Sequence, residues 1–185
     1  MKLVILDRDG VINIDSPDFI KSPEEWLPLK GSLEAIARLT QSGYDVVVLS
    51  NQSGVGRGLF SADMLAQIHV RMMDYVQQHG GKIQSVLVCP HHPDANCDCR
   101  KPQIGLYNEL AERLNTSFSG VYSVGDSMRD LIAAKTAGAV PVLVKTGNGK
   151  ATLQKLKNKG SDDLDSVLVF DNLAKFVDAM LSDNV

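Results

Sequence analysis

The chain has 185 residues, of which 44% are hydrophobic and 22% charged, and its formal net charge is −3. This length suits one domain with its own core, and the composition excludes a disordered or collagen-like chain. The acidic balance offers no basic surface for nucleic acid, and no segment approaches the roughly 18 consecutive apolar residues of a membrane helix. We therefore expect a single domain over residues 1–185 that is a monomer and has no nucleic-acid or membrane partner.

Strand patterns alternate with amphipathic-helix patterns along the chain. A first buried strand, 3–6, opens into a long loop over 11–29. Further strands are predicted over 46–49, 86–88, 120–124, 140–144 and 167–170, and helices over 31–43, 61–80, 102–114, 128–137, 150–159 and 172–181. The alternation predicts an α/β domain with a doubly wound, mainly parallel sheet. In such sheets ligands bind beyond the carboxyl ends of the strands.

Polar clusters follow four of these strands or lie in the loops that the strands open. They are Asp7 with Asp9, Ser50 with Asn51, Arg100 with Lys101, and Asp126 with Asp130. Because parallel strands end at one edge of a sheet, we expect the four clusters to converge. Crowded carboxylates are costly unless a cation joins them, and Mg²⁺ takes carboxylate oxygens together with substrate phosphates. The pattern predicts phosphate chemistry.

The carboxylates can be assigned the roles of phosphoryl transfer. Asp7 would attack phosphorus and form an aspartyl phosphate, and Asp9 would protonate the leaving alcohol and later activate water. Asp126 would complete the Mg²⁺ site, and Asp130 would orient the loop or a metal-bound water. For Asp130 the alternative is a first-turn carboxylate that the helix dipole favours. A calcium-binding loop starting at Asp7 is a poor alternative, because the later ligand positions lack the required glycine and glutamate.

Positive charge and hydrogen-bond donors can be assigned as well. Ser50 and the Asn51 region would donate hydrogen bonds to the phosphoryl oxygens, and Lys101 would neutralise their charge. Residues 54–58 lack the third glycine of a dinucleotide-binding loop, and 147–151 fail the P-loop pattern. We expect 54–58 to be a flexible loop that presents Arg57 to a substrate phosphate.

All three cysteines lie within one short segment over 89–99. Cys89, Cys97, Cys99 and one histidine supply the Cys₃His ligand set of a tetrahedral zinc site. We favour His91 over His92 as the fourth ligand. A disulfide between Cys97 and Cys99 would strain the bond geometry. Four protein ligands leave no open position, so the zinc is expected to be structural, and clustered free thiols indicate a reducing, cytoplasmic compartment.

The motifs LDRDG, LSNQSG, CRKP and GDSxxD together resemble the four motifs of the haloacid dehalogenase (HAD) superfamily of phosphatases. The segments DRDGVIN, SNQSGVGRG, CPHHP, CDCRKP and VKTG extend the resemblance, over most of the chain, to the heptose bisphosphate phosphatases within it. The resemblance implies Mg²⁺-dependent hydrolysis of the 7-phosphate of a heptose 1,7-bisphosphate, used for cell-surface polysaccharide. It also implies a structural zinc and no separate cap domain. Histidinol-phosphate phosphatase and a phospho-accepting signalling module are the alternatives.

The resemblance also assigns site residues. It implies that Asp7 is the nucleophile, that Asp9 is the acid and base and contacts Mg²⁺ through its backbone carbonyl, and that Arg100 recognises substrate. The sugar bisphosphate is expected to meet Asp15, Ser16, Pro17, Asp18, Asn51, Gln52, Ser53, Arg57, Arg100 and Ser127. The sequence departs from the family pattern at Ser50, at Pro17-Asp18, and at Ser127, where lysine often follows the metal aspartate.

Overall fold

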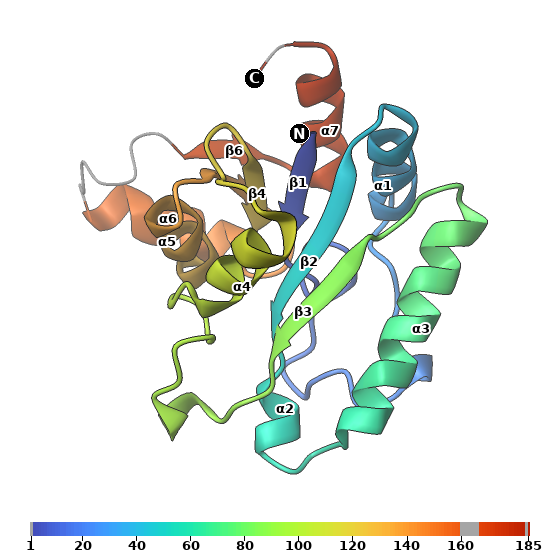
Figure 1. The fold of residues 1–185 in the computed structure, drawn as a ribbon, viewed down its shortest axis with the longest axis vertical. Coiled ribbons are helices and arrows are strands. Elements are labelled where there is room, and N and C mark those ends of the chain that lie inside the picture. Colours follow the sequence, from blue (N-terminus) through green and yellow to red (C-terminus); the bar gives the residue numbers. More distant parts are fainter. Residues whose placement is uncertain (1, 160–166, 184) are drawn as a thin grey trace.

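Six strands form one parallel sheet in the computed structural model, which describes residues 2–159, 167–183 and 185. The strands are β1 (Leu3–Leu6), β2 (Asp45–Asn51), β3 (Ser85–Cys89), β4 (Tyr122–Gly125), β5 (Val140–Val144) and β6 (Leu168–Phe170) (Figure 1). Their order is β3-β2-β1-β4-β5-β6, and all five pairings are parallel. The predicted doubly wound α/β fold is confirmed.

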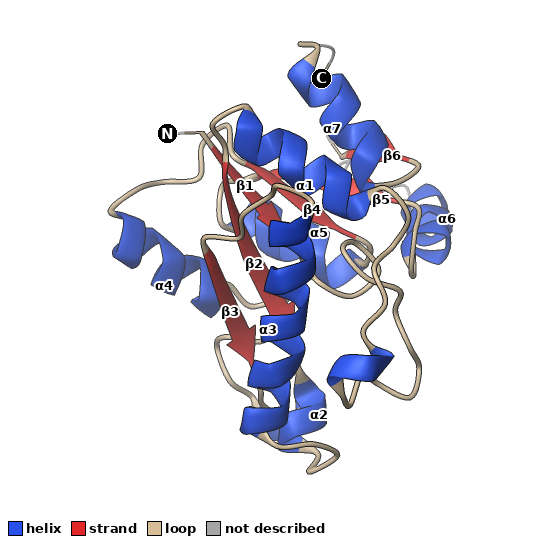
Figure 2. Ribbon diagram, turned by 90° about the vertical axis from the view of Figure 1, so that its right-hand side faces the viewer, coloured by secondary structure: helices blue, strands red, loops and turns tan. Residues whose placement is uncertain are grey.

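Helices cover both faces of the sheet. They are α1 (Ser32–Gln41), α2 (Ser53–Gly56), α3 (Ala62–Gln78), α4 (Gly105–Leu114), α5 (Met128–Thr136), α6 (Gly149–Lys159) and α7 (Leu173–Leu181), with 3₁₀ turns η1 (Pro23–Glu25) and η2 (Pro93–Ala95). Helices α1, α3 and α7 pack on one face, and α4 and α5 pack on the other (Figures 1 and 2). No helix in the described part of the chain has the length and apolar character needed to span a bilayer.

Strand β1 shows why an apolar run becomes a central strand. Val4 and Leu6 lie in the core beneath α1, α3 and α7, whereas Leu3 and Ile5 lie in the core beneath α4 and α5. All four side chains are buried, because helices cover both faces and successive side chains alternate between them. Burial of each such side chain stabilises the fold by about 1.5–3 kcal/mol. A strand held this firmly fixes the position of the residues that follow it.

The long loop between β1 and α1 is anchored to the core rather than free. Ile12 and Trp26 are fully buried, and the Trp26 ring packs edge-on against Tyr75 of α3, with ring centroids 5.7 Å apart. Backbone bridges join Asn13 to Asp9 and to Pro28. The loop therefore holds a defined path beside the carboxyl end of β1.

The predicted flexible loop over 54–58 is wrong in its first part, because residues 53–56 form the short helix α2. Its glycines allow close packing: a Cβ on Gly54 would lie 2.2 Å from the Phe60 ring, and one on Gly56 would lie 2.5 Å from the His92 backbone. Arg57 caps this helix at its C-terminal end. The glycines thus serve packing between loops rather than mobility.

Candidate active site

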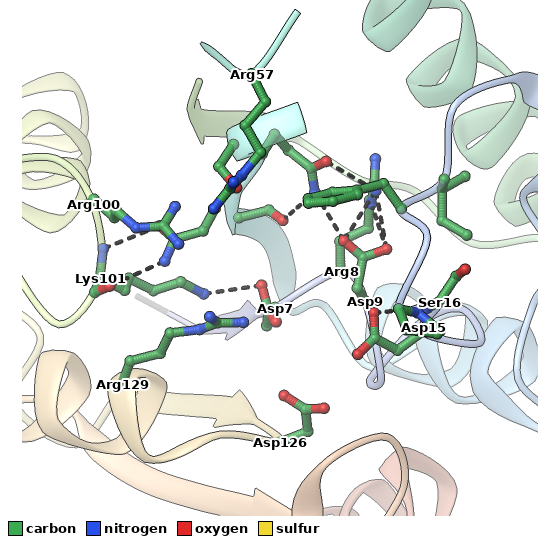
Figure 3. Close-up of a pocket in the computed structure, with 17 residues that line it drawn as sticks. Asp7, Arg8, Asp9, Asp15, Ser16, Arg57, Arg100, Lys101, Asp126 and Arg129 are labelled. Carbon is green, nitrogen blue, oxygen red and sulfur yellow. Dashed lines mark hydrogen bonds and ion pairs between the residues drawn. The ribbon is translucent and has the colours of Figure 1, made fainter. Parts of the chain in front are cut away.

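A cavity of about 280 Å³ lies at the carboxyl ends of the strands, where the chain order reverses between the neighbours β1 and β4. It is lined by Asp7, Arg8, Asp9, Asp15, Ser16, Pro17, Phe19, Ile20, Ser50, Asn51, Gln52, Ser53, Arg57, Arg100, Lys101, Asp126 and Arg129 (Figure 3). All four predicted polar clusters converge here, although Asp130 lies behind the lining and reaches it through Lys101.

Three buried carboxylates form the acidic centre of this cavity. Oxygens of Asp7, Asp126 and Asp130 lie within 4.8 Å of one another. The Lys101 ammonium, only 3% exposed, lies 2.9 Å from Asp7 Oδ1 and 2.7 Å from Asp130 Oδ1. Three carboxylates and one ammonium leave a formal charge of −2. That charge matches one divalent cation.

The pKa values report the same excess of negative charge. Burial, with Asp7 and Asp130 nearby, raises the pKa of Asp126 to about 7. Burial also raises the pKa of Asp7 to about 6, although Lys101 opposes the rise. Asp130 differs, because Lys101 and Ser127 outweigh burial and lower its pKa. Its Oδ2 also accepts hydrogen bonds from the Ser127 backbone and hydroxyl, as in a capping box.

Asp7 and Asp126 are left to face a cation. Both oxygens of Asp130 are engaged by Lys101 and Ser127, whereas Asp126 receives bonds at Oδ2 alone among the described residues. Carboxylate oxygens in a −2 pocket are the donor set that Mg²⁺ prefers. The residues present therefore fit Mg²⁺, and the cation-facing oxygens belong to Asp7 and Asp126.

The loop after β5 holds Asp126 in place. The Asn148 backbone N–H donates to Asp126 Oδ2 at 2.7 Å, and the Asn148 side chain donates to it at 3.2 Å. Gly10 and Gly147 make room for the carboxylate, since a Cβ on either would lie 2.2 Å from Oδ2. Thr146 ties the two loops together by donating to the Gly10 carbonyl at 2.6 Å. This role was not predicted from the sequence, where the segment was considered only as a rejected P-loop and as part of the VKTG resemblance.

Asp9 lies apart from the acidic centre and has its own partners. Its carboxylate accepts hydrogen bonds from Arg8 Nε and Nη2, Asn13 Nδ2 and Gln52 Nε2, at 2.8–3.1 Å. Burial raises its pKa, but the Arg8 guanidinium and these bonds lower it below its usual value. The side chain therefore takes no part in the carboxylate cluster, and a contact between its backbone carbonyl and Mg²⁺ stays a prediction.

The segment at the end of β2 positions Ser50 and Lys101. The Asn51 amide exchanges two hydrogen bonds of 3.0 Å with the Lys101 backbone, and Lys101 Nζ donates to the Leu49 carbonyl. Gln52 Nε2 donates to Ser50 Oγ at 2.8 Å, so the Ser50 hydroxyl hydrogen is free to donate elsewhere. Asn51 and Gln52, predicted as substrate contacts, thus line the cavity but bond to its other residues.

Arg57, Arg100 and Arg129 line the cavity around Lys101, with Arg57 and Arg100 above it and Arg129 below it in Figure 3. Arg100 Nη1 is buried and has no hydrogen-bond partner among the described residues. Burial and the nearby charges of Arg129 and Arg57 lower the pKa of Arg100. Sequence reasoning missed Arg129, although its place near the start of a helix that follows a strand-end aspartate was a usable signal. The three arginines form a subsite suited to an anion.

The loop over 15–18 contributes only part of what was predicted. Asp15, Ser16 and Pro17 line the cavity opposite the arginines, and Asp15 Oδ2 accepts a hydrogen bond from Asn148 at 2.9 Å. Asp18 lines a neighbouring hollow instead. Ser127 also lies outside the cavity lining, because its hydroxyl caps α5. Asp18 and Ser127 are therefore not among the residues that line this cavity, and their contact with the substrate stays a prediction.

The cysteine segment gathers into a second candidate metal site. Sγ of Cys89 lies 3.6 Å from His91 Nδ1 and 3.6 Å from Cys97 Sγ, while Cys99 Sγ lies 3.2 Å from His91 Nδ1 and 3.6 Å from Cys97 Sγ. Tetrahedral Zn²⁺ with bonds of about 2.0–2.3 Å places neighbouring ligand atoms roughly 3.3–3.8 Å apart, a range that includes the three 3.6 Å distances and lies just above the 3.2 Å one. The cluster thus fits zinc, and it contains His91, whereas His92 bonds to Asp94.

Comparisons with known proteins agree with this geometry. A family model described as HAD-hydrolase-like matches residues 98–175. The chain is 54% identical over 153 residues to D-glycero-beta-D-manno-heptose-1,7-bisphosphate 7-phosphatase of Bordetella bronchiseptica, covering 83% of this chain and 86% of that protein. It is 46% identical to the protein of that name from Pseudomonas aeruginosa, covering 97% of each chain.

A solved structure is similar over the whole chain. The D,D-heptose 1,7-bisphosphate phosphatase of B. bronchiseptica, complexed with magnesium and phosphate, has a TM-score of 0.94 and 48% identity, and 99% of each chain is covered. Fold and site together define a phosphatase of the HAD class, with a parallel sheet and strand-end carboxylates. Within that class, the chain belongs to the D-glycero-beta-D-manno-heptose-1,7-bisphosphate 7-phosphatase family.

Proposed function

We propose that this protein is a Mg²⁺-dependent phosphatase that removes the 7-phosphate of D-glycero-β-D-manno-heptose 1,7-bisphosphate. The observation that carries the proposal is the pairing of Asp7 and Asp126, whose free oxygens share one cavity with the Lys101 ammonium. The names of the relatives supply the sugar and its β anomer. They give no support to histidinol phosphate as the substrate.

The reaction proceeds in two steps, phosphoryl transfer to Asp7 and hydrolysis of the aspartyl phosphate. With substrate bound, Asp9 first takes up a proton from solvent, since its lowered pKa leaves it ionised in the free enzyme. An Asp7 oxygen attacks phosphorus, the bond from phosphorus to the sugar oxygen breaks, and Asp9 gives that proton to the sugar oxygen, so the alcohol leaves. Water then attacks the aspartyl phosphate, Asp9 takes a proton from the water, and the bond from phosphorus to Asp7 breaks to release phosphate. Bound Mg²⁺, held by Asp7 and Asp126, would neutralise charge on the phosphoryl oxygens.

Other residues of the cavity stabilise the transferring group. The Ser50 hydroxyl, which accepts from Gln52, has its hydrogen available for a phosphoryl oxygen. Lys101 is fixed by Asp7, Asp130 and Leu49 and supplies positive charge without side-chain reorganisation. The Asn51 amide holds the Lys101 backbone in register with β2.

The uncleaved phosphate of a bisphosphate would occupy the arginine side of the cavity. Arg57, Arg100 and Arg129 face it, and the unpartnered Arg100 Nη1 is a donor in need of an acceptor. On the opposite side, the Asp15 carboxylate would accept hydrogen bonds from sugar hydroxyls, and the Ser16 hydroxyl would donate to them or accept from them. Zinc, held by the Cys₃His cluster, would fix the loop that leads directly into Arg100 and Lys101.

Two further expectations are that the protein is a monomer and that it lies in the cytoplasm. The free thiols of Cys89, Cys97 and Cys99 support the second, because thiols stay reduced in that compartment. Sedimentation of the purified protein tests the first, and cell fractionation tests the second.

A phosphate-release assay tests the function. With Mg²⁺ supplied, kcat/KM for the heptose 1,7-bisphosphate should exceed that for heptose 7-phosphate and for histidinol phosphate by at least about tenfold, given two to three charged contacts to the second phosphate. A preference for histidinol phosphate would overturn the proposal. A wild-type aspartyl phosphate that persists for many minutes would instead support a signalling module.

A further inference from the structure

Arg8, the residue between the two aspartates of the first motif, is a deeply buried charge in the lining of the cavity. Its side chain is only 1% exposed. A buried guanidinium is costly unless it is paired and its donors are used. Arg8 meets this requirement through Asp9: Nε donates to Oδ1 at 3.1 Å, and Nη2 donates to Oδ2 at 2.9 Å (Figure 3). This two-point fork fixes the plane of the carboxylate as well as its position.

The Asp9 carboxylate is fully engaged. Asn13 donates to Oδ1 and Gln52 donates to Oδ2, so together with the Arg8 fork each oxygen accepts two hydrogen bonds. An ionised carboxylate offers about four lone-pair sites, and all are used. Asp9 can therefore give or take a proton only after one donor withdraws, and the remaining donors decide where the freed oxygen points.

His69 of α3 contacts the Arg8 guanidinium from outside the cavity lining. Its Nε2 lies 3.3 Å from Arg8 Nη1. Because a guanidinium has donors and no acceptor, Nε2 must accept, which places the histidine proton on Nδ1. Burial and the Arg8 charge lower the pKa of His69 to about 4, which keeps the ring neutral at physiological pH. His69 does not line the cavity, and its contact with the site runs through Arg8.

We propose that Arg8, braced by His69, is a positioning residue that aims the Asp9 carboxylate at the oxygen of the leaving alcohol. The proposal rests on the proposed function, because it assumes that Asp9 transfers the proton. Asn13 is fully buried, and both hydrogens of its amide are used, by Asp9 and by the Ile14 carbonyl. Gln52 is held in the same way, since its amide donates to Asp9 and to Ser50 and its Oε1 accepts from Arg8 Nη2 at 3.1 Å.

The test compares leaving groups. A sugar alcohol leaves poorly without a proton, whereas p-nitrophenolate leaves readily without one. A mispositioned Asp9 should therefore lower kcat/KM only for the sugar substrate, because kcat/KM reports the steps up to departure of the leaving group and not the later hydrolysis that also uses Asp9. For Arg8→Met, kcat/KM on the sugar bisphosphate should fall on the order of 10- to 100-fold, with p-nitrophenyl phosphate within about threefold of wild type. Arg8→Lys keeps the charge and loses the fork, and it should show the same selective loss.

Substitutions at His69 extend the test to a residue outside the cavity. His69→Leu removes the acceptor and should produce a weaker selective loss, on the order of 3- to 10-fold. His69→Gln keeps an acceptor oxygen and should recover activity to within about twofold of wild type. His79→Gln, at the exposed end of the same helix, is the matched control and should change neither substrate.

Equal losses on both substrates, or no loss on either, would overturn the proposal. If Arg8→Met does not fold, as judged by thermal unfolding, the two His69 variants decide. Should wild type ignore the heptose bisphosphate, the proposed substrate fails, while Arg8 is still tested on whichever alkyl phosphate the enzyme hydrolyses best. Absence of all phosphatase activity would reject both.

Discussion

At the scale of single residues, Asp126 carries the clearest electrostatic signature. Its carboxylate is 1% exposed, and its pKa is raised from 3.8 to about 7 by burial and by Asp7 and Asp130. The folded state therefore binds a proton more tightly than the unfolded chain does. Without metal, the stability that this proton confers is complete below pH 4 and is lost as pH rises through about 7.

Magnesium should reverse that loss. We expect the rise in Tm on adding Mg²⁺ to be larger at pH 8 than at pH 6, because protons compete for Asp7 and Asp126 at the lower pH. The stability at stake is on the order of 2–4 kcal/mol. Calorimetry at both pH values, with and without Mg²⁺, measures it. In Asp126→Asn the pH-dependent Mg²⁺ effect should disappear, and its persistence would place the cation elsewhere.

Arg129 is a separate single-residue case. Its guanidinium faces the cavity beside Arg100, and replacement by alanine would remove one proposed partner of the second phosphate. We expect Arg129→Ala to raise KM for the heptose bisphosphate about 5- to 30-fold and to leave kcat nearly unchanged. The KM for heptose 7-phosphate, which lacks that phosphate, should not change. Arg113→Ala on α4 is the control, since Arg113 is exposed and pairs with Glu109.

The sequence predicts some of these residues and not others, for a physical reason. Asp7 and Asp126 directly follow β1 and β4, and Ser50 lies at the end of β2, so strand position alone brings these three to one edge. Lys101 is separated from β3 by the segment that carries the cysteines. The role of Arg8 depends on His69, which lies 61 residues away on a helix, and no local pattern encodes that contact. Tertiary partners of this kind are visible only in the structure.

At the scale of elements, the cysteine segment over 89–99 connects β3 to the loop that precedes α4. It leaves the sheet at Cys89, the metal-ligand cluster closes at Cys99, and the next two residues are Arg100 and Lys101. Because Asn51 holds the Lys101 backbone independently, loss of zinc should displace Arg100 more than Lys101. The consequence should be weaker substrate binding before loss of chemistry.

A cysteine substitution tests whether zinc in the cysteine segment supports substrate binding. We expect Cys97→Ser to lose the zinc measured by elemental mass spectrometry, to lower Tm, and to raise KM several-fold more than it lowers kcat. His92→Gln is the matched control, because His92 neighbours the cluster without joining it, and it should keep one zinc per chain. Loss of zinc in His92→Gln would contradict the assignment of His91 as ligand.

Element boundaries show where sequence patterns fall short. The six strands were predictable to within about two residues, because buried β-strands of this length stand out as apolar runs. Helix α2 was not, since four residues containing two glycines carry no helical periodicity and form a helix only against Phe60 and His92. The helix predicted over 102–114 begins instead at Gly105, and Ile104 is its N-cap.

At the scale of the whole molecule, the reversal of strand order between β1 and β4 decides which segments meet. Loops after β1, β2, β4 and β5 supply Asp9, Gln52, Asp126 and Asn148, although these residues span most of the chain. The Asp15 contact with Asn148 and the stacking of Arg57 on Phe19, at 5.9 Å, join the loops to one another. A ligand bound to Asp7 should therefore change the amide protection of loops that are distant in sequence.

Hydrogen exchange can measure this coupling. Beryllofluoride with Mg²⁺ forms a phosphoryl-like adduct on an accessible aspartate, so it should slow amide exchange in three segments together, 9–20, 50–57 and 146–150. The turns at the opposite ends of the strands, such as 43–45 and 137–139, should be unchanged, because they share no contact with the cavity. Asp7→Asn cannot form the adduct and should show no protection. Protection confined to 9–20 would mean that the loops respond independently and that the cavity does not act as one unit.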